Sequence, residues 1–334
     1  MNQTQNKNRK PHPEITLIGA AIVDVLAGPV SEKVFQTGSE PVDFMKFSFG
    51  GDALNEAVCL SRLGNQVELI SQVGRDQTGI NVLNFLKQNE VDISKISVED
   101  GLQTGMNIVM VGEDAQRYFL TNPRSSLRTL SKEVILPQLD TAADIIGFAS
   151  LFVSYRLDIA AMEEVFAEVK KKPGRILTVD MTSAKKGEKL KDLLPLFAYI
   201  DVLFANDNEA CLLTGEEDPV RNAALFTGAG LPCAVIKCGG KGCVMGTREG
   251  TFVLPAFPHV TCVDTTGAGD CFAAGFLWGL SMKLSLRQCG CLGNASASCC
   301  VEQYGATDGI ISSEEIWRRY EILSGNCGSA PFKA

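Results

Sequence analysis

Short apolar runs alternate with segments of helical spacing along nearly the whole chain. The expected strands cover residues 15–25, 67–73, 145–149, 175–180, 202–205 and 234–237. The expected helices repeat apolar side chains at helical intervals and cover residues 52–63, 79–89, 158–172, 189–200 and 271–281. This alternation predicts parallel βαβ units, with helices on both faces of one sheet and the strand ends meeting along one edge.

Two stretches in the first half of the chain interrupt the alternation. Residues 27–49 contain strand-type residues and turn signals but no helical spacing, and residues 104–121 resemble a hairpin that turns at 112–114. The simplest account is one α/β domain that carries a small β-sheet, built from insertions at about 26–49 and 104–122. Such a sheet could cover a site as a lid and could also form a dimer through its exposed edge.

The length of the chain, 334 residues, is sufficient for one large α/β domain, which we expect to span residues 14–325. Residues 1–13 are expected to be a disordered leader and residues 326–334 a tail. The leader has no apolar core, which excludes a secretory signal, and the chain has no uncharged apolar run long enough to cross a membrane. A cytoplasmic location is therefore expected.

Composition and charge exclude several kinds of function. The chain has 31 basic and 39 acidic residues and a net charge of −8, which argues against broad nucleic-acid binding. Only His12 and His259 are present, so a three-histidine metal site is impossible. Its 12 cysteines include no C-x-x-C pair, and a protein in the reducing cytosol would not use them as a disulfide framework. Carboxylates, backbone amides and bound ions remain as the expected chemistry.

The strongest local signal is the segment VDTTGAGDCFAAGF, residues 263–276. Gly267, Ala268 and Gly269 present backbone N–H groups at the start of an expected helix, where the helix dipole favours an anion. Asp270 follows on the first helical turn, where a carboxylate can accept a proton from an attacking hydroxyl. Taken alone, an aspartate here could equally be an ordinary acid at a helix N-terminus.

This segment resembles the C-terminal signature of the PfkB, or ribokinase-like, family of carbohydrate kinases. Three further stretches resemble family motifs in the same order, namely FGGDALNEAVCLSRLG at 49–64, NDNE at 206–209 and VIKCGGKG at 235–242. The resemblance implies a three-layer α/β/α fold with a mostly parallel central sheet and a β-sheet lid. It also implies an ATP-dependent kinase that uses Mg²⁺ and a monovalent cation, expected to be K⁺.

The resemblance implies roles for individual residues. The catalytic set is the base Asp270 with the anion hole Gly267, Ala268 and Gly269. The substrate would be bound by Asp24, Gly50, Gly51 and Asn55. The nucleotide would be bound by Asn206, Glu209, Lys237, Gly239, Gly242 and Asn294, with Glu209 also holding Mg²⁺ through water. The monovalent cation would lie in the loop of Asp264 and Thr266, with Gly305 nearby.

The acceptor is less defined by the sequence. Ile22 stands where ribokinase-type members carry an asparagine, which argues against ribose. Arg124 and Arg156 could bind the carboxylate of a sugar acid, and Arg124 is taken as a substrate-binding residue; both could instead be surface arginines. Within the family, the GAAIVD opening at 19–24 and the TNPRSSL stretch at 121–127 resemble poorly characterised bacterial sugar kinases more than ribokinase or adenosine kinase.

The expected function is transfer of the γ-phosphoryl group of ATP to a primary hydroxyl of a sugar or sugar acid. Two alternatives remain open: a nucleoside kinase of the same fold, and a catalytically silent sugar-binding sensor. The expected partners are a small-molecule substrate and a second copy of the chain, bound through the β-lid.

Overall fold

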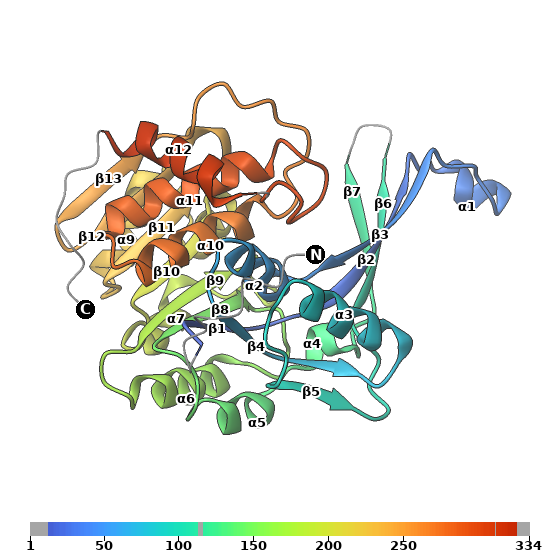
Figure 1. Ribbon diagram of the computed structural model, residues 1–334, viewed down its shortest axis with the longest axis horizontal. Helices are drawn as coiled ribbons and strands as arrows, with labels where there is room; N and C mark the ends of the chain where they lie inside the picture. The colour runs from blue at the N-terminus through green and yellow to red at the C-terminus, as the bar shows by residue number, and fades with distance from the viewer. Residues whose placement is uncertain (1–12, 113–115, 311, 326–334) are drawn as a thin grey trace, which may run out of the picture.

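The computed structural model describes residues 13–112, 116–310 and 312–325. Nearly all of the expected leader 1–13, the expected tail 326–334 and two of the three residues of the expected turn 112–114 lie outside the described residues. The described chain forms a large sheet with helices on both faces and a small separate sheet at one side (Figure 1).

The large sheet contains nine strands among the described residues, in the order β13-β12-β11-β10-β9-β8-β1-β4-β5. Neighbouring strands are parallel from β5 through β11, and only the pairs β11–β12 and β12–β13 are antiparallel. The strands are β1 Ile15–Ile18, β4 Val67–Gly74, β5 Ile96–Glu99, β8 Ile145–Leu151, β9 Ile176–Met181, β10 Val202–Asn206, β11 Cys233–Lys237, β12 Cys243–Thr247 and β13 Gly250–Leu254.

One layer of helices packs on each face of this sheet. The first layer shares a hydrophobic core with one face and consists of α2 Asp52–Arg62, α3 Gln77–Gln88, α10 Ala268–Ser281, α11 Leu286–Cys300 and α12 Ser313–Ser324. The second shares a separate core with the other face and consists of α5 Lys132–Ile135, α6 Ile159–Lys170, α7 Leu190–Phe197, α8 Asp207–Thr214 and α9 Pro219–Gly228. The short elements α4 Ser126–Thr129, η1 Leu136–Gln138 and η2 Gly239–Lys241 connect larger ones. The predicted three-layer architecture is confirmed.

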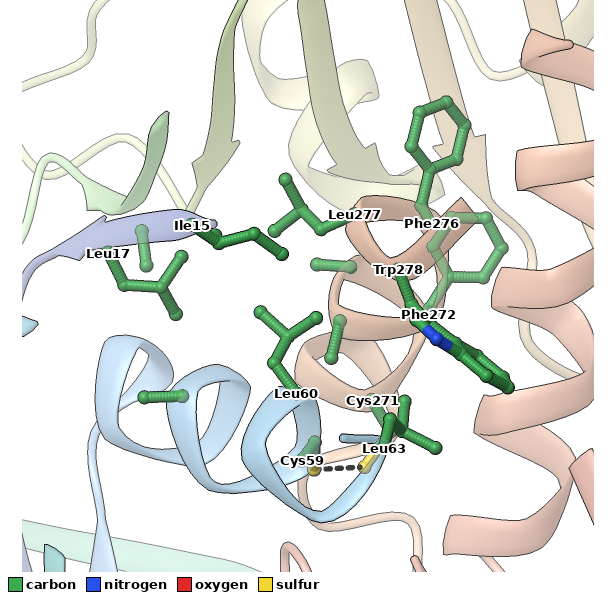
Figure 2. Close-up of a cluster of buried hydrophobic side chains, with 14 of the residues drawn as sticks. Ile15, Leu17, Cys59, Leu60, Leu63, Cys271, Phe272, Phe276, Leu277 and Trp278 are labelled. Carbon is green, nitrogen blue, oxygen red and sulfur yellow. Dashed lines mark hydrogen bonds between the residues drawn. The ribbon is translucent and has the colours of Figure 1, made fainter. Parts of the chain in front are cut away.

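The alternation of side chains along β1 and the packing of α2 against α10 determine where the N-terminus of α10 lies. Ile15 and Leu17 of β1 point to the first core, whereas Ile18 belongs to the second, as expected for a strand buried on both faces. Figure 2 shows the side chains of β1, α2 and α10 in one buried cluster, in which Leu60 and Leu277 take part. Because α2 and α10 are packed together over the sheet, side chains at their N-termini meet at the same edge.

The small sheet takes its strands from the two stretches that interrupt the sequence pattern. Its order is β3-β2-β6-β7, with β2 Ile22–Gly28, β3 Phe44–Gly50, β6 Met106–Val111 and β7 Arg117–Thr121. The pair β2–β6 is parallel and the other two pairs are antiparallel. Figure 1 shows this sheet projecting from the side of the main body. The predicted small sheet beside a large parallel one is thus present.

Two expectations for the N-terminal region are wrong. The apolar run 15–25 is not one strand, because β1 ends at Ile18 and β2 begins at Ile22 in the other sheet. A single apolar run cannot reveal this division, since both strands are apolar. The stretch 27–49 also contains a helix, α1 Lys33–Thr37, which buries none of its residues. A helix this short and exposed has no apolar periodicity to detect.

Candidate active site

Most of the residues predicted to bind the nucleotide, together with Gly269 and Asp270, lie at the carboxyl edge of the large sheet. A cavity of about 780 Å³ opens there, between the ends of β9, β10 and β11 and the start of α10. Its lining includes Asn206, Glu209, Lys237, Gly269, Asp270 and Asn294. This is the position at which open α/β sheets bind ligands, because loops diverge from the carboxyl ends of parallel strands.

Gly267 shapes the start of α10. It is the N-cap residue and has a left-handed φ of 72°, and a Cβ added to it would lie 2.4 Å from the carbonyl oxygen of Ala306. Only glycine therefore fits without moving the chain. Ala268 and Gly269 follow on the first turn, where backbone N–H groups have no partner within the helix, and the Ala268 N–H donates to the Thr265 carbonyl oxygen at 3.2 Å. The arrangement can receive an anion such as a phosphoryl group.

Asp270 lies on the same first turn, beside this anion hole. Asn55 on α2 donates a hydrogen bond from Nδ2 to Oδ2 of Asp270 at 2.7 Å. Burial raises the pKa of Asp270 well above its usual range and the charge of Asp52 adds to this, whereas the hydrogen bond from Asn55 opposes it. A raised pKa suits a carboxylate that must accept a proton from a hydroxyl.

Lys237 brings positive charge to the anion hole. Its Nζ lies 3.2 Å from the position that a Cβ on Gly269 would take, and 2.7 and 2.9 Å from the two carboxylate oxygens of Asp180. Burial would lower the pKa of Lys237, but the charges of Asp180 and Glu209 prevail and raise it to about 12. Lys237 is therefore cationic. Sequence reasoning missed Asp180, although an acid at the end of a strand, RILTVD, was a usable signal.

The nucleotide-side residues lie along the same cavity. Asn206 and Glu209 form a capping box at the start of α8, in which each side chain accepts a 2.8 Å hydrogen bond from the other residue's backbone N–H. Burial raises the pKa of Glu209 to about 7. Gly239 and Gly242 also line the cavity. The Asn294 amide donates to the carbonyl oxygens of Leu254 and Pro255, at 3.1 and 3.0 Å, and so holds that part of the wall.

The acceptor-side residues lie around the start of α2. Gly51 is its N-cap residue, with φ at 95°, and a Cβ there would lie 2.5 Å from the carbonyl oxygen of Ala20. Asp24 Oδ1 accepts a 2.8 Å hydrogen bond from Asn107, and Oδ2 lies 2.5 Å from where a Cβ on Gly50 would be. The buried Oδ1 of Asn55 has no hydrogen-bond partner. An amide oxygen in this state can accept a hydrogen bond from a substrate hydroxyl.

Asp52 was not singled out from the sequence, yet it lines the cavity at the first position of α2. Ser150 donates a short hydrogen bond to Asp52 Oδ2. Ser150 has a left-handed φ of 72°, which is costly for a residue other than glycine and occurs preferentially at functional sites. No local sequence pattern indicates this pair, because it joins α2 to the end of β8.

Arg124 and Arg156 are not brought to the cavity. Both are exposed, and neither lines the described cavity. The backbone N–H of Arg124 donates to Asn122 Oδ1 at 2.9 Å, within the loop that follows β7. The substrate-binding role of Arg124 stays a prediction. His259 lines the cavity, and His12 lies outside the described residues.

The residues of the expected cation loop do come together. Asp264 Oδ1 accepts hydrogen bonds from the backbone N–H and hydroxyl of Thr266, at 2.9 and 2.6 Å, and Oδ2 accepts one from the Gly305 N–H at 3.1 Å. These bonds tie the loop before the anion hole to the loop after α11. Within the described residues, no group of three or more His, Cys, Asp or Glu side chains is arranged to hold a metal ion. Nor does any described helix have the length and apolar character needed to cross a membrane.

The chain is similar to known proteins over most of its length. The family model for pfkB family carbohydrate kinases matches residues 13–313. A ribokinase from Haemophilus influenzae is 27% identical over 275 residues, which cover 81% of this chain and 86% of that protein. An uncharacterized sugar kinase from Archaeoglobus fulgidus is 32% identical over 260 residues, which cover 75% of this chain and 97% of that protein.

Solved structures share the fold. One from E. coli, described as a ribokinase II in complex with ATP and Mg²⁺, superposes with a TM-score of 0.77 at 23% sequence identity. The match covers 93% of this chain and 99% of that one. At this identity the likeness bears on the fold alone, and it confirms the predicted ribokinase-like architecture.

Proposed function

The chain belongs to the pfkB family of carbohydrate kinases, and on that premise we propose that it transfers the γ-phosphoryl group of ATP to a primary hydroxyl of a sugar or sugar acid. One arrangement carries the proposal. Asp270 lies on the first turn of α10 beside the amides of Gly267–Gly269, and the Lys237 ammonium reaches the same place. A base, an anion hole and a fixed cation therefore meet around one point.

In the proposed reaction, Asp24 and the free Oδ1 of Asn55 bind acceptor hydroxyls. Asp270 takes the proton of the attacking hydroxyl as its oxygen forms a bond to the transferred phosphorus. The backbone amides of 267–269 and Lys237 stabilise the charge on the transferred group. The small sheet excludes water, which limits wasteful hydrolysis. The ADP oxygen leaves as the bond to phosphorus breaks.

Glu209 and Asn206 would hold Mg²⁺ through water. Glu209 fits this role because it is a carboxylate that faces the cavity and is already fixed by the Asn206 backbone. When bound, Mg²⁺ neutralises charge on the phosphates. A monovalent cation at the loop of Asp264, Thr266 and Gly305 would order the anion hole. Whether the enzyme requires this cation can be measured by comparing initial rates in K⁺, Na⁺ and a bulky organic cation at equal ionic strength.

The deciding experiment is ADP release with a panel of acceptors: aldoses, ketoses, aldonates, 2-keto-3-deoxy acids and nucleosides. A sugar or sugar acid should give the highest kcat/KM. Turnover confined to nucleosides would identify the nucleoside kinase instead. Firm sugar binding without turnover of any acceptor would favour the silent sensor, and the intact Asp270 and Gly267–Gly269 argue against that outcome.

We further propose that the protein is a homodimer, assembled through the small sheet. Along the paired strands, one face of the sheet carries Met45, Phe47, Ile108, Tyr118 and Leu120. The exposed fraction of each of these side chains lies between 46% and 78%. The opposite face carries Asp24 and Asn107. An exposed apolar face of this kind is typical of a surface that a second chain covers.

A further inference from the structure

One face of α2 points toward the start of α10. Asp52, Asn55, Glu56 and Cys59 are spaced by three or four residues, so they lie together on the helix surface. Asn55 donates to Asp270, and Cys59 Sγ lies 3.4 Å from Cys271 Sγ. Figure 2 marks the contact between Cys59 and Cys271 with a dashed line. Glu56 follows Asn55 directly and lies one turn before Cys59 on the same helix.

Glu56 is a buried acid, and most of the charged groups around it oppose its ionisation. Only 2% of it is exposed, and its Oε1 is fully buried without a hydrogen-bond partner. The charged groups that face it are Asp180 at the end of β9, Asp270 on α10, Asp52 on its own helix and Lys237 on β11. Three of these four are acids, so an ionised Glu56 would lie in a strongly unfavourable field.

The neighbouring acids differ from Glu56 in their hydrogen bonds. Asp270 receives the Asn55 amide, Asp180 receives Lys237, and Asp52 receives the Ser150 hydroxyl. A donor directed at a carboxylate stabilises its charged form. The Oε1 of Glu56 receives no such donor. When a cluster of acids must retain a proton, the member without donors retains it at the lowest cost.

We propose that Glu56 is a positioning residue: as a neutral acid it holds the proton of the Glu56–Asp270 pair and thereby leaves Asp270 ionised to act as the base. The proposal rests on the proposed function, in which Asp270 accepts the acceptor's proton. Glu56 itself exchanges no proton during phosphoryl transfer. The acceptor's proton goes to Asp270 and returns to solvent when the products leave.

The pKa of each acid is raised, and the two differ in that only Asp270 receives a hydrogen bond that opposes the shift. Burial raises the pKa of Glu56 well above its usual range, and the charges of Asp180 and Asp270 raise it further. Burial and Asp52 also raise the pKa of Asp270, but the Asn55 hydrogen bond lowers it. Of two repelling carboxyls that share a proton, the one with a hydrogen-bond donor ionises first.

Infrared difference spectroscopy on the full-length protein without ligands tests the proposal directly. At pH 8, exchange into D₂O should reveal the C=O stretching band of one or more buried, protonated carboxyl groups. We expect Glu56→Gln to lose one such band and Asp270→Asn to retain it. Glu209→Gln is the control and should leave that band in place, because the pKa of Glu209 is about 7.

A band lost in Asp270→Asn but retained in Glu56→Gln would place the proton on the base and overturn the proposal. Loss of no band in Glu56→Gln, or the absence of any such band from the unmodified protein, would overturn it as well. If Glu56→Gln does not fold by circular dichroism, Glu56→Asp replaces it, and its band should shift in frequency rather than vanish.

The pH profile provides a second readout once an acceptor is known. Glutamine has the shape of the neutral acid, so Glu56→Gln should retain kcat within about threefold near neutral pH. It should also lose the decline in kcat at high pH that ionisation of Glu56 causes in the unmodified protein. An unchanged alkaline decline would contradict the proposal. Because the infrared result needs no turnover, its failure is distinguishable from failure of the kinase assignment.

Discussion

Asp270 depends on residues that are distant along the chain. Its hydrogen-bond donor Asn55 lies 215 positions earlier, and the two meet because α2 and α10 pack on the same face of the sheet. The donor orients the carboxylate, while burial keeps it basic enough to accept a proton. The proposed role of Asp270 as the base therefore requires that its own carboxyl group is ionised.

Asp270→Asn removes the proton acceptor but keeps the shape of the side chain. We expect kcat to fall by about 10²–10⁴-fold, with nucleotide affinity nearly unchanged. Asp140→Asn, an exposed change of the same kind, is the control and should retain full activity. Turnover and nucleotide titration on both variants measure this. Residual activity within tenfold of the unmodified protein would mean that another group is the base.

Glu209 should make stability depend on pH. Burial raises its pKa from 4.5 to about 7, so between these values the folded protein binds a proton that the unfolded chain releases. The resulting stabilisation, on the order of 3 kcal/mol, is fully present below pH 4.5 and is lost as pH rises through 7. Thermal unfolding without Mg²⁺ should therefore show a contribution that declines over this range.

Glu209→Gln should flatten that part of the profile, whereas the exposed Glu217→Gln should not. The same slope in Glu209→Gln as in the unmodified protein would refute the assignment to Glu209.

Apart from the family resemblance, the residues themselves predicted the site only where its chemistry is local. Gly267, Gly269 and Asp270 lie within four positions, so the anion hole and its base could be predicted from one segment. Asp52 and Asp180 belong to the site only because β8, β9 and α2 end at the same edge. Their partners, Ser150 and Lys237, are 98 and 57 positions away. No sequence spacing encodes such contacts.

At the scale of elements, the turn before α10 limits which residues can form the anion hole. Gly267 combines a left-handed φ of 72° with a close approach to the Ala306 carbonyl oxygen. Gly215 after α8 has a similar φ of 78°, but nothing lies within 4 Å of the place for its Cβ. Substituting each glycine in turn therefore distinguishes the effect of backbone strain alone from the effect of strain combined with a steric clash.

Gly267→Ala should lose most activity and destabilise the protein by more than Gly215→Ala does. The latter should cost only about 1–2 kcal/mol, the price of a left-handed alanine, and retain activity. Chemical denaturation and turnover measure both effects. Equal losses of stability and equal activity in the two variants would show that the Ala306 contact has no importance for the anion hole.

Elements with strong periodicity were predicted well, and short or uniformly apolar ones were not. The helix expected at 52–63 is α2, and the strand expected at 67–73 is β4. The helices α8, α9, α11 and α12 were not predicted. For α11, eleven buried residues of mixed small and polar type leave no apolar stripe to recognise. The division between β1 and β2 depends on which sheet each strand joins, and that is a tertiary choice.

At the scale of the whole molecule, the two faces of the small sheet differ in character. The face with Asp24 and Asn107 mixes polar side chains with apolar ones such as Phe119, which is 59% exposed, whereas the face with Phe47 and Ile108 is apolar and largely exposed. Alternation of side chains along each strand produces this difference. The mixed face carries Asp24 of the proposed site, and the apolar face is the proposed dimer surface.

Ile108→Lys places a charge at the centre of the apolar face and should convert the proposed dimer to a monomer. Val253→Lys makes the same change on β13 of the large sheet, where the side chain is 63% exposed, and should leave the dimer intact. Sedimentation equilibrium on both variants measures the effect. A monomeric unmodified protein, or an unchanged dimer in Ile108→Lys, would contradict the proposed interface.

The short connection from β1 to β2 leads from the large sheet to the small sheet, and the residues of the proposed site are distributed over both. Residues 19–21 lead from the large sheet into the small one, so Asp24 travels with the small sheet. Asn55 and Asp270 are anchored to the large sheet through α2 and α10. Any rotation about this hinge changes the distance between Asp24 and the other two residues. An acceptor that contacts both Asp24 and the other two residues would therefore favour the closed arrangement, and part of its binding free energy would drive that closure. A sugar too short to reach both sides would not favour closure.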